Sequence, residues 1–370
     1  MYRVADYGRM FADPVRMDAY VAALTRHVRP GSVVVDLGAG TGIFSLLACK
    51  LGARRVYAIE TNDAIQLLPG LARENGFADR VEVLQRPSTE VTLPELADVL
   101  VSDLRGALPL MGAHLPSLVD ARARFLAPSG VLLPQGDTLV AALVDAEDLY
   151  QRLTAPWDGA AFGLSMRCAR ASVVNTAYSD HDCALRAEQQ VTPARAWARL
   201  DYRTLTSPSV SGAARWLAER ACVAHGVALW FDADVDDHAS YSNAPGTSLV
   251  YGRCFLPFPS PLVLAEGDDI TVDLVAQWDG DDYTWGWSTR VTAPSASAPR
   301  VRHRQSTFLG RPTSLEQLRR GHPDHVPGLS AAGAAERAIV GWLDGARTLR
   351  ELAERARAEH PRAFADDAAA

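Results

Sequence analysis

Lysine is nearly absent from this 370-residue sequence: Lys50 is the only one, and arginine supplies the rest of the 37 basic residues. The basic residues form no long run, and the 44 acidic residues give the chain a formal net charge of −7. Proteins that bind nucleic acids usually gather basic residues on one face. The composition therefore predicts no nucleic-acid partner.

Cysteine is also sparse, and the five cysteines are scattered without a Cys-x-x-Cys pair. Such spacing predicts neither a zinc site nor a disulfide framework, so we expect no metal. The first residues lack the apolar segment of a signal peptide, and no apolar run approaches the length that spans a membrane. These absences predict a cytoplasmic protein without a membrane partner.

The sequence from residue 32 to residue 133 alternates short apolar runs with stretches of helical periodicity. Strands are expected at Ser32–Leu37, Arg55–Glu60, Arg80–Gln85, Ala97–Ser102 and Gly130–Leu133. Such alternation is typical of a parallel sheet covered by helices. We therefore predict an α/β domain with N-terminal helices over residues 1–136.

After residue 136 the pattern changes to short β-like runs between Gly, Pro and Asp turns, which favours an antiparallel β-barrel. The runs are Thr138–Val144, Ala198–Leu205, Val227–Ala233, Leu249–Phe255 and Asp269–Trp278. We place this second domain at residues 137–300. Residues 301–370 are expected to form a small helical unit, with helices at Ala331–Leu343 and Thr348–Ala358.

A glycine-rich turn follows the first expected strand. The residues of interest are Asp36, Gly38, Gly40, Gly42 and, at the end of the next strand, Glu60. Glycine lets the backbone approach a ligand closely and adopt positive φ, and an acid at the end of the second strand can bind both hydroxyls of a ribose. The unit resembles the S-adenosylmethionine site of Rossmann-like methyltransferases; a purely structural turn is the alternative.

Together these features resemble the protein arginine methyltransferase family, in which a Rossmann-like domain precedes a β-barrel with a dimerisation arm. The resemblance covers roughly residues 2–290. It implies S-adenosylmethionine as cofactor and S-adenosylhomocysteine as product. It also implies a homodimer, because an arm at about residues 151–172 would dock Trp157 and Phe162 on a second subunit. Alternatively, these two aromatic side chains fill the barrel's own core.

The resemblance also implies a set of cofactor contacts. The family's N-terminal helix supplies an arginine to the cofactor carboxylate, and Arg16 at the end of Met10–Arg16 matches it, with a solvated helix charge as the alternative. The turn from Gly38 to Gly42 would hold the methionine moiety, and Glu60 would hold the ribose. Ser88 lies where the family contacts the adenine.

The expected acceptor loop departs from the family pattern. Family members place Ser-Glu-x-Met-Gly after the fourth strand, with a second glutamate shortly after. This chain has Ser102-Asp103-Leu104-Arg105-Gly106, and the position of the second glutamate falls near Gly112. The family's Thr-His-Trp motif falls near Ser248–Gly252, where the histidine is absent.

This loop contains the candidate catalytic residues. Asp103 is the first choice of base by position, and His114 is the second because its intrinsic pKa suits base chemistry near neutrality, although a lone histidine can equally be structural. Arg105 leaves the pocket close to neutral and suits an anionic group on the acceptor. Alternatively, Arg105 points away and pairs with a surface acid.

The main hypothesis from the sequence is therefore methyl transfer from S-adenosylmethionine to an O or N of a small metabolite or a peptide natural product. One alternative keeps the family's activity, N-methylation of arginine in a protein or as the free amino acid. Another is an S-adenosylmethionine-binding scaffold without catalysis, which the intact glycine turn and Glu60 make less favourable.

Overall fold

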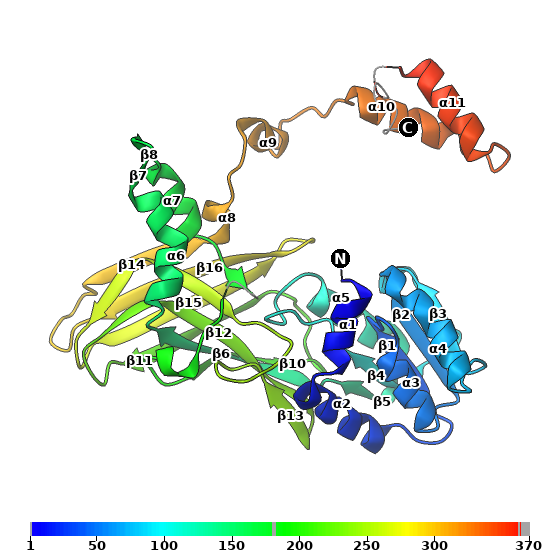
Figure 1. The fold of residues 1–370 in the computed structure, drawn as a ribbon, viewed down its shortest axis with the longest axis horizontal. Coiled ribbons are helices and arrows are strands. Elements are labelled where there is room, and N and C mark those ends of the chain that lie inside the picture. Colours follow the sequence, from blue (N-terminus) through cyan, green and yellow to red (C-terminus); the bar gives the residue numbers. More distant parts are fainter. Residues whose placement is uncertain (1, 180–182, 362, 364–370) are drawn as a thin grey trace. The chain divides into compact units, whose positions relative to one another are not determined.

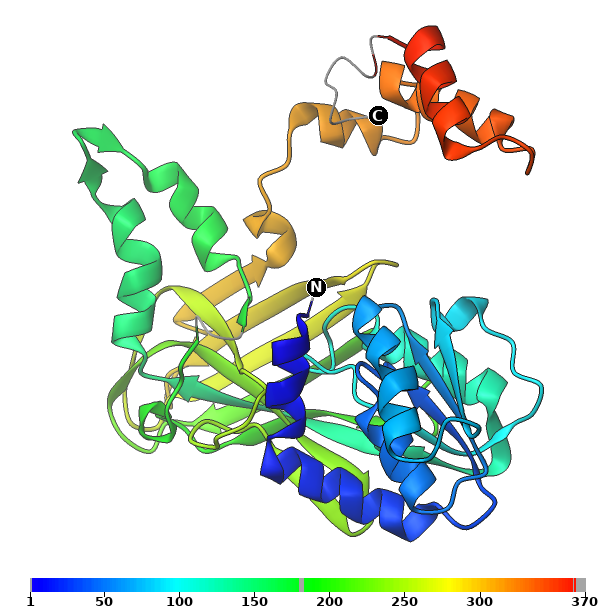
Figure 2. The same cartoon turned by 45° about the vertical axis from the view of Figure 1, so that its right-hand side comes forward.

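The computed structural model describes residues 2–179, 183–361 and 363. The chain divides into two compact units, Met1–Arg311 and Pro312–Ala370. The first unit contains a parallel sheet and two large antiparallel sheets, and the second contains helices (Figures 1 and 2).

Five parallel strands form the first sheet, in the order β3-β2-β1-β4-β5. They are β1 (Val33–Leu37), β2 (Arg55–Glu60), β3 (Val81–Gln85), β4 (Ala97–Ser102) and β5 (Leu126–Leu133). Every residue of β1 is buried, as expected of a central parallel strand. The strand order reverses between β1 and β4, and ligands of open α/β sheets bind at the carboxyl ends of the strands beside such a reversal.

Helices and short 3-10 turns accompany this sheet (Figure 1). They are α1 (Val4–Phe11), α2 (Pro14–His27), α3 (Ile43–Lys50), η1 (Asp63–Leu67), α4 (Leu68–Glu74), η2 (Ser88–Glu90) and α5 (His114–Phe125). Helix α2 begins after Asp13, whose carboxylate accepts a hydrogen bond from the Arg16 amide at 3.3 Å. Because Arg16 and Tyr20 are four residues apart, they share the buried face of α2.

Two antiparallel sheets follow. One has the order β10-β6-β12-β14-β9 with β13 beside β12, and the other has the order β11-β15-β16-β17. The strands are β6 (Gly136–Val144), β9 (Tyr178–Ser179), β10 (Arg195–Asp201), β11 (Val210–Leu217), β12 (Cys222–Asp236), β13 (Ala239–Ser242), β14 (Cys254–Leu264), β15 (Asp269–Trp278), β16 (Tyr283–Thr292) and β17 (Val301–Ser306), and a 3-10 turn η4 (Ala187–Gln189) precedes β10. Buried and less buried residues alternate along β16, so one face of this sheet lines the core. The predicted fold class, a Rossmann-like domain followed by an antiparallel barrel, is confirmed.

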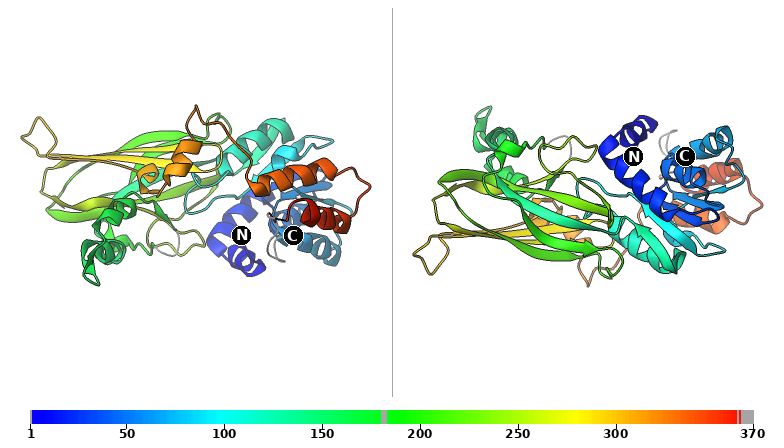
Figure 3. Two further views of the ribbon diagram at one scale, coloured as in Figure 1. Left: turned by 90° about the horizontal axis from the view of Figure 1, so that it is seen from above. Right: turned by 90° about the horizontal axis from the view of Figure 1, so that it is seen from below.

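A helical hairpin projects from the barrel and is seen from further sides in Figure 3. It consists of α6 (Glu147–Asp158), β7 (Ala160–Ala161), β8 (Leu164–Ser165) and α7 (Arg167–Val174). Phe162, at its tip, is fully exposed, so this side chain does not fill the barrel core. Trp157 is partly buried.

The two predicted domain limits can be compared with the strand bounds and with the division into compact units. The limit at residues 136 and 137 falls at the first residues of β6. Beyond the limit at residue 300, the chain continues the barrel sheet through β17 and adds α8 (Thr307–Gly310), and the compact units divide after Arg311. The second unit contains α9 (Leu315–Arg320), α10 (Ala331–Trp342) and α11 (Leu349–Glu359), of which α10 and α11 correspond to the two helices expected from the sequence.

Candidate active site

The glycine-rich turn lies at the carboxyl end of β1, beside the reversal of strand order. Gly38, Gly40 and Gly42 have φ values of +76°, +55° and +90°, which only glycine adopts readily. A Cβ atom at Gly38 would lie 2.1 Å from a methyl carbon of Leu104, and one at Gly40 would lie 2.5 Å from the Tyr7 ring. The turn therefore requires glycine both for its backbone conformation and for its close contacts.

Asp36, in β1, binds the first turn of α3 through Ser45. Its carboxylate accepts hydrogen bonds from the Ser45 amide at 2.9 Å and the Ser45 hydroxyl at 2.7 Å, and its other oxygen has no partner within the described part of the chain. Burial raises the pKa of Asp36 to about 7, against the lowering effect of the Ser45 hydrogen bonds. The structure thus places Asp36 as a buried support of the turn.

Glu60 ends β2 and faces the same turn. One of its oxygens accepts the Gly40 amide at 2.9 Å, and the other accepts the amides of Thr61 at 2.7 Å and Asn62 at 2.8 Å. Ser88, in η2, is buried, and its carbonyl oxygen accepts a hydrogen bond from Arg124 at 2.6 Å. Glu60 lies at the end of β2 and Ser88 lies after β3, as the sequence predicted.

Four buried charged side chains meet beside the turn, and we name Arg16, Asp103, Arg105 and Asp137 the charged quartet. Asp103 follows β4, so the pairing of Leu37 with Ser102 between β1 and β4 brings it close to the glycine turn. The four side chains come from α2, the loop after β4 and β6, and none is more than 7% exposed.

Arg16 contacts the acceptor-loop acid in this structure. Its Nε donates to Asp103 Oδ2 in a short contact and to the Tyr251 hydroxyl at 3.1 Å, and its Nη1 donates to the Met10 carbonyl at 3.0 Å. Its guanidinium also lies over the rings of Tyr20 and Phe44, at 5.6 and 5.3 Å from their centres. The predicted contact between Arg16 and the cofactor carboxylate stays a prediction.

Asp103 is bracketed by two guanidinium groups. Arg16 binds its Oδ2, Arg105 Nη1 donates to its Oδ1 at 3.1 Å, and the Tyr251 hydroxyl donates to Oδ2. Burial alone would raise the pKa of this carboxyl, but the two arginines hold it below its ordinary value. A carboxylate with a depressed pKa is a poor proton acceptor, so the structure favours Asp103 as a cation-binding group over the predicted base.

Arg105 does not face an acceptor, which corrects the sequence-based assignment. Its Nε and Nη2 form a two-pronged ion pair with Asp137, both at 2.8 Å, and its side chain is completely buried. Its Nη1 donates to the Tyr20 hydroxyl at 2.9 Å and the Tyr241 hydroxyl at 3.1 Å, as well as to Asp103. Each nitrogen of this guanidinium has a partner, and the buried group is paired with Asp137, so Arg105 is not presented to an anionic acceptor. The acid it meets is also a buried one rather than the surface acid of the alternative.

His114 is likewise not a base poised near neutrality. It opens α5, is 1% exposed, and its Nε2 lies 3.3 Å from the Tyr202 hydroxyl. Burial, together with the Arg105 charge, lowers the pKa of His114 to about 3, so the imidazole is neutral and weakly basic. The structural alternative of the sequence analysis describes this residue better.

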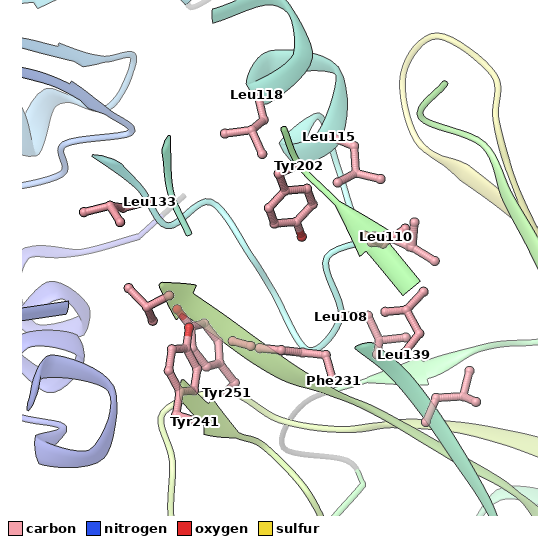
Figure 4. Packing of buried hydrophobic residues seen from close by; sticks show 14 of the residues in the cluster. Leu108, Leu110, Leu115, Leu118, Leu133, Leu139, Tyr202, Phe231, Tyr241 and Tyr251 are labelled. Carbon is pink, nitrogen blue, oxygen red and sulfur yellow. The ribbon is translucent and has the colours of Figure 1, made fainter. Parts of the chain in front are cut away.

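Sequence reasoning missed the tyrosines that surround the charged quartet. They are Tyr20 on α2, Tyr202 after β10, Tyr241 on β13 and Tyr251 before β14. Figure 4 shows Tyr241 and Tyr251 side by side, with their ring planes 9° apart and their centres 6.3 Å apart. Burial raises the pKa of all four hydroxyls, so they remain neutral hydrogen-bonding groups. Tyr251 occupies the segment where the family's histidine motif was sought; no local signal marks the other three.

Comparison with known proteins shows which methyltransferases this chain resembles. The sequence pattern of the ribosomal protein L11 methyltransferase (PrmA) family matches residues 19–154. Over 291 residues the chain is 29% identical to protein arginine N-methyltransferase 6 of Xenopus laevis, covering 73% of this chain and 83% of the relative. The chain is similar to protein arginine N-methyltransferases over most of its length. It is also 42% identical over 127 residues to PRMT10 of Oryza sativa subsp. japonica, covering 34% of this chain and 33% of that relative.

The share of each relative that the chain covers differs. It spans 59% of the probable protein arginine N-methyltransferase 6 of Arabidopsis thaliana, with 29% identity over 257 residues, which are 67% of this chain. Two solved structures match with a TM-score of 0.72 each. One is Arabidopsis thaliana protein arginine methyltransferase 10, at 21% identity and covering 82% of this chain and 98% of that one. The other is the Trypanosoma brucei PRMT1 enzyme-prozyme complex with AdoHcy, at 20% identity and covering 81% and 96%. These structural likenesses establish the fold.

The relationship confirms the predicted enzyme class, an S-adenosylmethionine-dependent methyltransferase, and the predicted cofactor. It overturns the main hypothesis on the acceptor: the small-metabolite or peptide natural-product reading is wrong, because the relatives are protein arginine N-methyltransferases. The structure gives the physical reason for the error. That reading relied on Arg105 as an anion-binding group, whereas Arg105 is neutralised by Asp137.

The described residues also bear on the predictions about membranes and metals. None of the helices there is both long and apolar enough to cross a membrane. The same residues contain no group of three or more His, Cys, Asp or Glu side chains placed to hold a metal ion. The predicted cytoplasmic location stays a prediction.

Proposed function

We propose that this protein transfers a methyl group from S-adenosylmethionine to a guanidinium nitrogen of an arginine in a polypeptide. The observation that carries the proposal is the environment of Asp103: this carboxylate, at the end of β4, already binds a guanidinium group, that of Arg16. Tyr251 supports the same oxygen with its hydroxyl. A site that holds one guanidinium in this way has the charge and the geometry to hold another.

The residues beside the quartet fit the cofactor. Gly38, Gly40 and Gly42 have no Cβ atoms, so the backbone of the turn is open to a ligand. The carboxylate of Glu60 lies next to the turn and can accept hydrogen bonds from the two hydroxyls of a ribose. Arg16 carries the charge that complements the cofactor carboxylate. In the proposed complex the Gly38–Gly42 turn holds the methionine moiety, Glu60 the ribose and Ser88 the adenine side.

When bound, S-adenosylmethionine supplies an electrophilic methyl group. The protein's part is to position the acceptor: Asp103 binds the guanidinium through charge-assisted hydrogen bonds and directs one nitrogen toward the cofactor site. Because Arg105 and Tyr251 fix both oxygens of Asp103, the carboxylate is oriented before the acceptor arrives. The methylated nitrogen then releases its proton to solvent, which agrees with the low basicity of Asp103.

We also propose a homodimer formed through the hairpin α6–α7. The supporting observation is that the hairpin exposes Phe162 completely and Leu164 to 65% at its tip. Large apolar side chains left in water on a projecting element are typical of an interaction surface. The similar Trypanosoma brucei PRMT1 structure is a heterotetramer, so subunit association occurs among the proteins that share this fold.

Substitution of Asp103 tests the proposed activity. Asp103→Asn keeps the shape of the side chain but removes its charge, so kcat/KM for an arginine-containing peptide is expected to fall about 100-fold. Asp201→Asn is the matched control, because Asp201 pairs with Arg203 on the barrel surface. Methyl transfer is measured with methyl-labelled S-adenosylmethionine, and binding of S-adenosylhomocysteine shows that the variant is folded. Equal activity of Asp103→Asn and the parent protein would contradict the proposal.

A further inference from the structure

The charged quartet is electrically balanced. It contains two carboxylates, Asp103 and Asp137, and two guanidiniums, those of Arg16 and Arg105, in the alternating order Arg16, Asp103, Arg105, Asp137. Asp137 and Arg105 are fully buried, and Asp103 is 2% exposed at its side chain. The hydroxyls of Tyr20, Tyr202, Tyr241 and Tyr251, which hydrogen-bond to the quartet, all stay protonated and neutral. The imidazole of His114, which contacts Tyr202, is uncharged as well.

Arg16 is the member that the proposed function assigns elsewhere. In the structure its guanidinium occupies Asp103, at the position proposed for the acceptor. If the cofactor carboxylate holds Arg16, an acceptor guanidinium takes its place on Asp103. The quartet then again contains two positive and two negative charges. The site is therefore balanced for one monocation at Asp103.

Asp137 makes this balance possible. It comes from the first barrel strand, β6, and binds Arg105 with both oxygens at 2.8 Å, while the Tyr202 hydroxyl donates to its Oδ2. Without Asp137, the charges of Asp103 and Arg105 would cancel, and an incoming guanidinium would add an uncompensated positive charge to a buried site. Burial of an unpaired charge is strongly unfavourable.

We propose that Asp137 is a specificity-determining residue that acts through Arg105: it keeps the acceptor site one negative charge in excess and so selects a monocationic side chain over a neutral one of the same shape. This inference rests on the proposed function. It assigns to a barrel strand the second carboxylate that the acceptor loop lacks, since the family's second glutamate falls near Gly112 in this chain. Asp137 does not touch the acceptor; it sets the charge that the acceptor meets.

The test compares binding of an arginine-containing peptide with binding of the same peptide carrying citrulline, a neutral side chain of nearly the same shape. Both are measured by fluorescence anisotropy with S-adenosylhomocysteine present. The parent protein is expected to prefer arginine. Asp137→Asn should weaken arginine binding about 30-fold and leave citrulline binding within about threefold, so that the preference is lost.

A double variant separates charge from structure. Arg105→Met with Asp137→Asn removes one charge of each sign and restores the excess negative charge on Asp103, so the preference for arginine should return. A purely structural role predicts the opposite, because the double variant loses more hydrogen bonds than Asp137→Asn alone. If Asp137→Asn does not fold, Asp137→Glu, which keeps the charge, and the double variant carry the comparison.

The outcomes distinguish this inference from the proposed function. A parent protein that binds S-adenosylhomocysteine but shows no preference for arginine over citrulline contradicts the proposed function itself. A parent protein that prefers arginine, combined with an Asp137→Asn variant that keeps the same preference, overturns only the role of Asp137. The surface variant Asp201→Asn should retain the parent preference, because its charge lies outside the quartet.

Discussion

Replacing Asp36 by asparagine is expected to stabilise the protein at alkaline pH. Asp36 lies in β1 just before the glycine turn, is completely buried, and accepts two hydrogen bonds from Ser45 on one oxygen. An asparagine carbonyl can accept the same two hydrogen bonds and carries no charge to desolvate. The substitution therefore removes the dependence of stability on pH that this carboxyl creates.

The direction follows from proton linkage. Burial raises the pKa of Asp36 from 3.8 to about 7, so the folded protein holds a proton that the unfolded chain releases. The contribution of this group to stability is fully present below pH 3.8 and is lost as the pH rises through about 7. From pH 5.5 to about pH 7 the unfolded chain is ionised at this position while the folded protein keeps its proton, so about 2 kcal/mol of stability is lost; above pH 7 both states are ionised and the loss stops.

Urea denaturation of the cofactor-free protein at pH 5.5 and pH 8.5 provides the measurement. The free energy of unfolding of Asp36→Asn, relative to the parent protein, should rise by about 2 kcal/mol from the lower to the higher pH. Asp201→Asn should show no such change, because its pKa is lowered, chiefly by the hydrogen bond from Arg203, and the carboxyl is ionised throughout this range. A difference between parent and Asp36→Asn that is the same at both pH values would refute the reasoning.

Two further substitutions test the turn and the hairpin. Gly38→Ala should weaken binding of S-adenosylhomocysteine at least about tenfold in calorimetry, because a Cβ atom there meets Leu104; Gly76→Ala, which shares a φ near +75° but meets nothing within 4 Å, should leave binding unchanged. Phe162→Asp with Leu164→Asp should convert the dimer to a monomer in light scattering. Leu349 is also an exposed apolar side chain but lies in the second unit, so Leu349→Asp should leave the mass of the dimer unchanged. A monomeric parent protein would contradict the proposed hairpin interface.

Four of the five parallel strands could be predicted from the sequence almost to the residue. β2 and β4 have the expected bounds, β1 and β3 begin one residue later than expected, and β5 begins at Leu126 rather than at Gly130. These strands are short apolar runs between helical stretches, and that local pattern is set by burial on both faces. The glycine turn was found for the same reason, because its conformation depends on residues adjacent in sequence.

The barrel was less predictable because its pattern is weaker. β14 was expected at Leu249–Phe255 but spans Cys254–Leu264, and Pro257, Pro259 and Pro261 lie inside it. Proline disfavours a strand assignment because it lacks an amide hydrogen for the ladder. β11 was missed because small residues such as Gly212 and Ala213 dilute its alternation.

The chemistry of the acceptor site was predicted only in part. Asp103 was identified because it follows a strand and matches a motif. The partner of Arg105 lies 32 residues away on a barrel strand, and no local pattern links the two. A charge can be assigned from the sequence, but whether it faces a ligand or another side chain depends on tertiary contacts. For Arg105 the tertiary contact is the ion pair with Asp137.

The most direct test of the proposed activity is incubation of the purified 370-residue protein with methyl-labelled S-adenosylmethionine and an arginine-rich polypeptide, followed by acid hydrolysis and mass spectrometry of the amino acids. Labelled ω-N-methylarginine is expected from the parent protein, and Asp103→Asn should lose that label. Binding of the cofactor without labelled arginine, or label on a different amino acid, would contradict it.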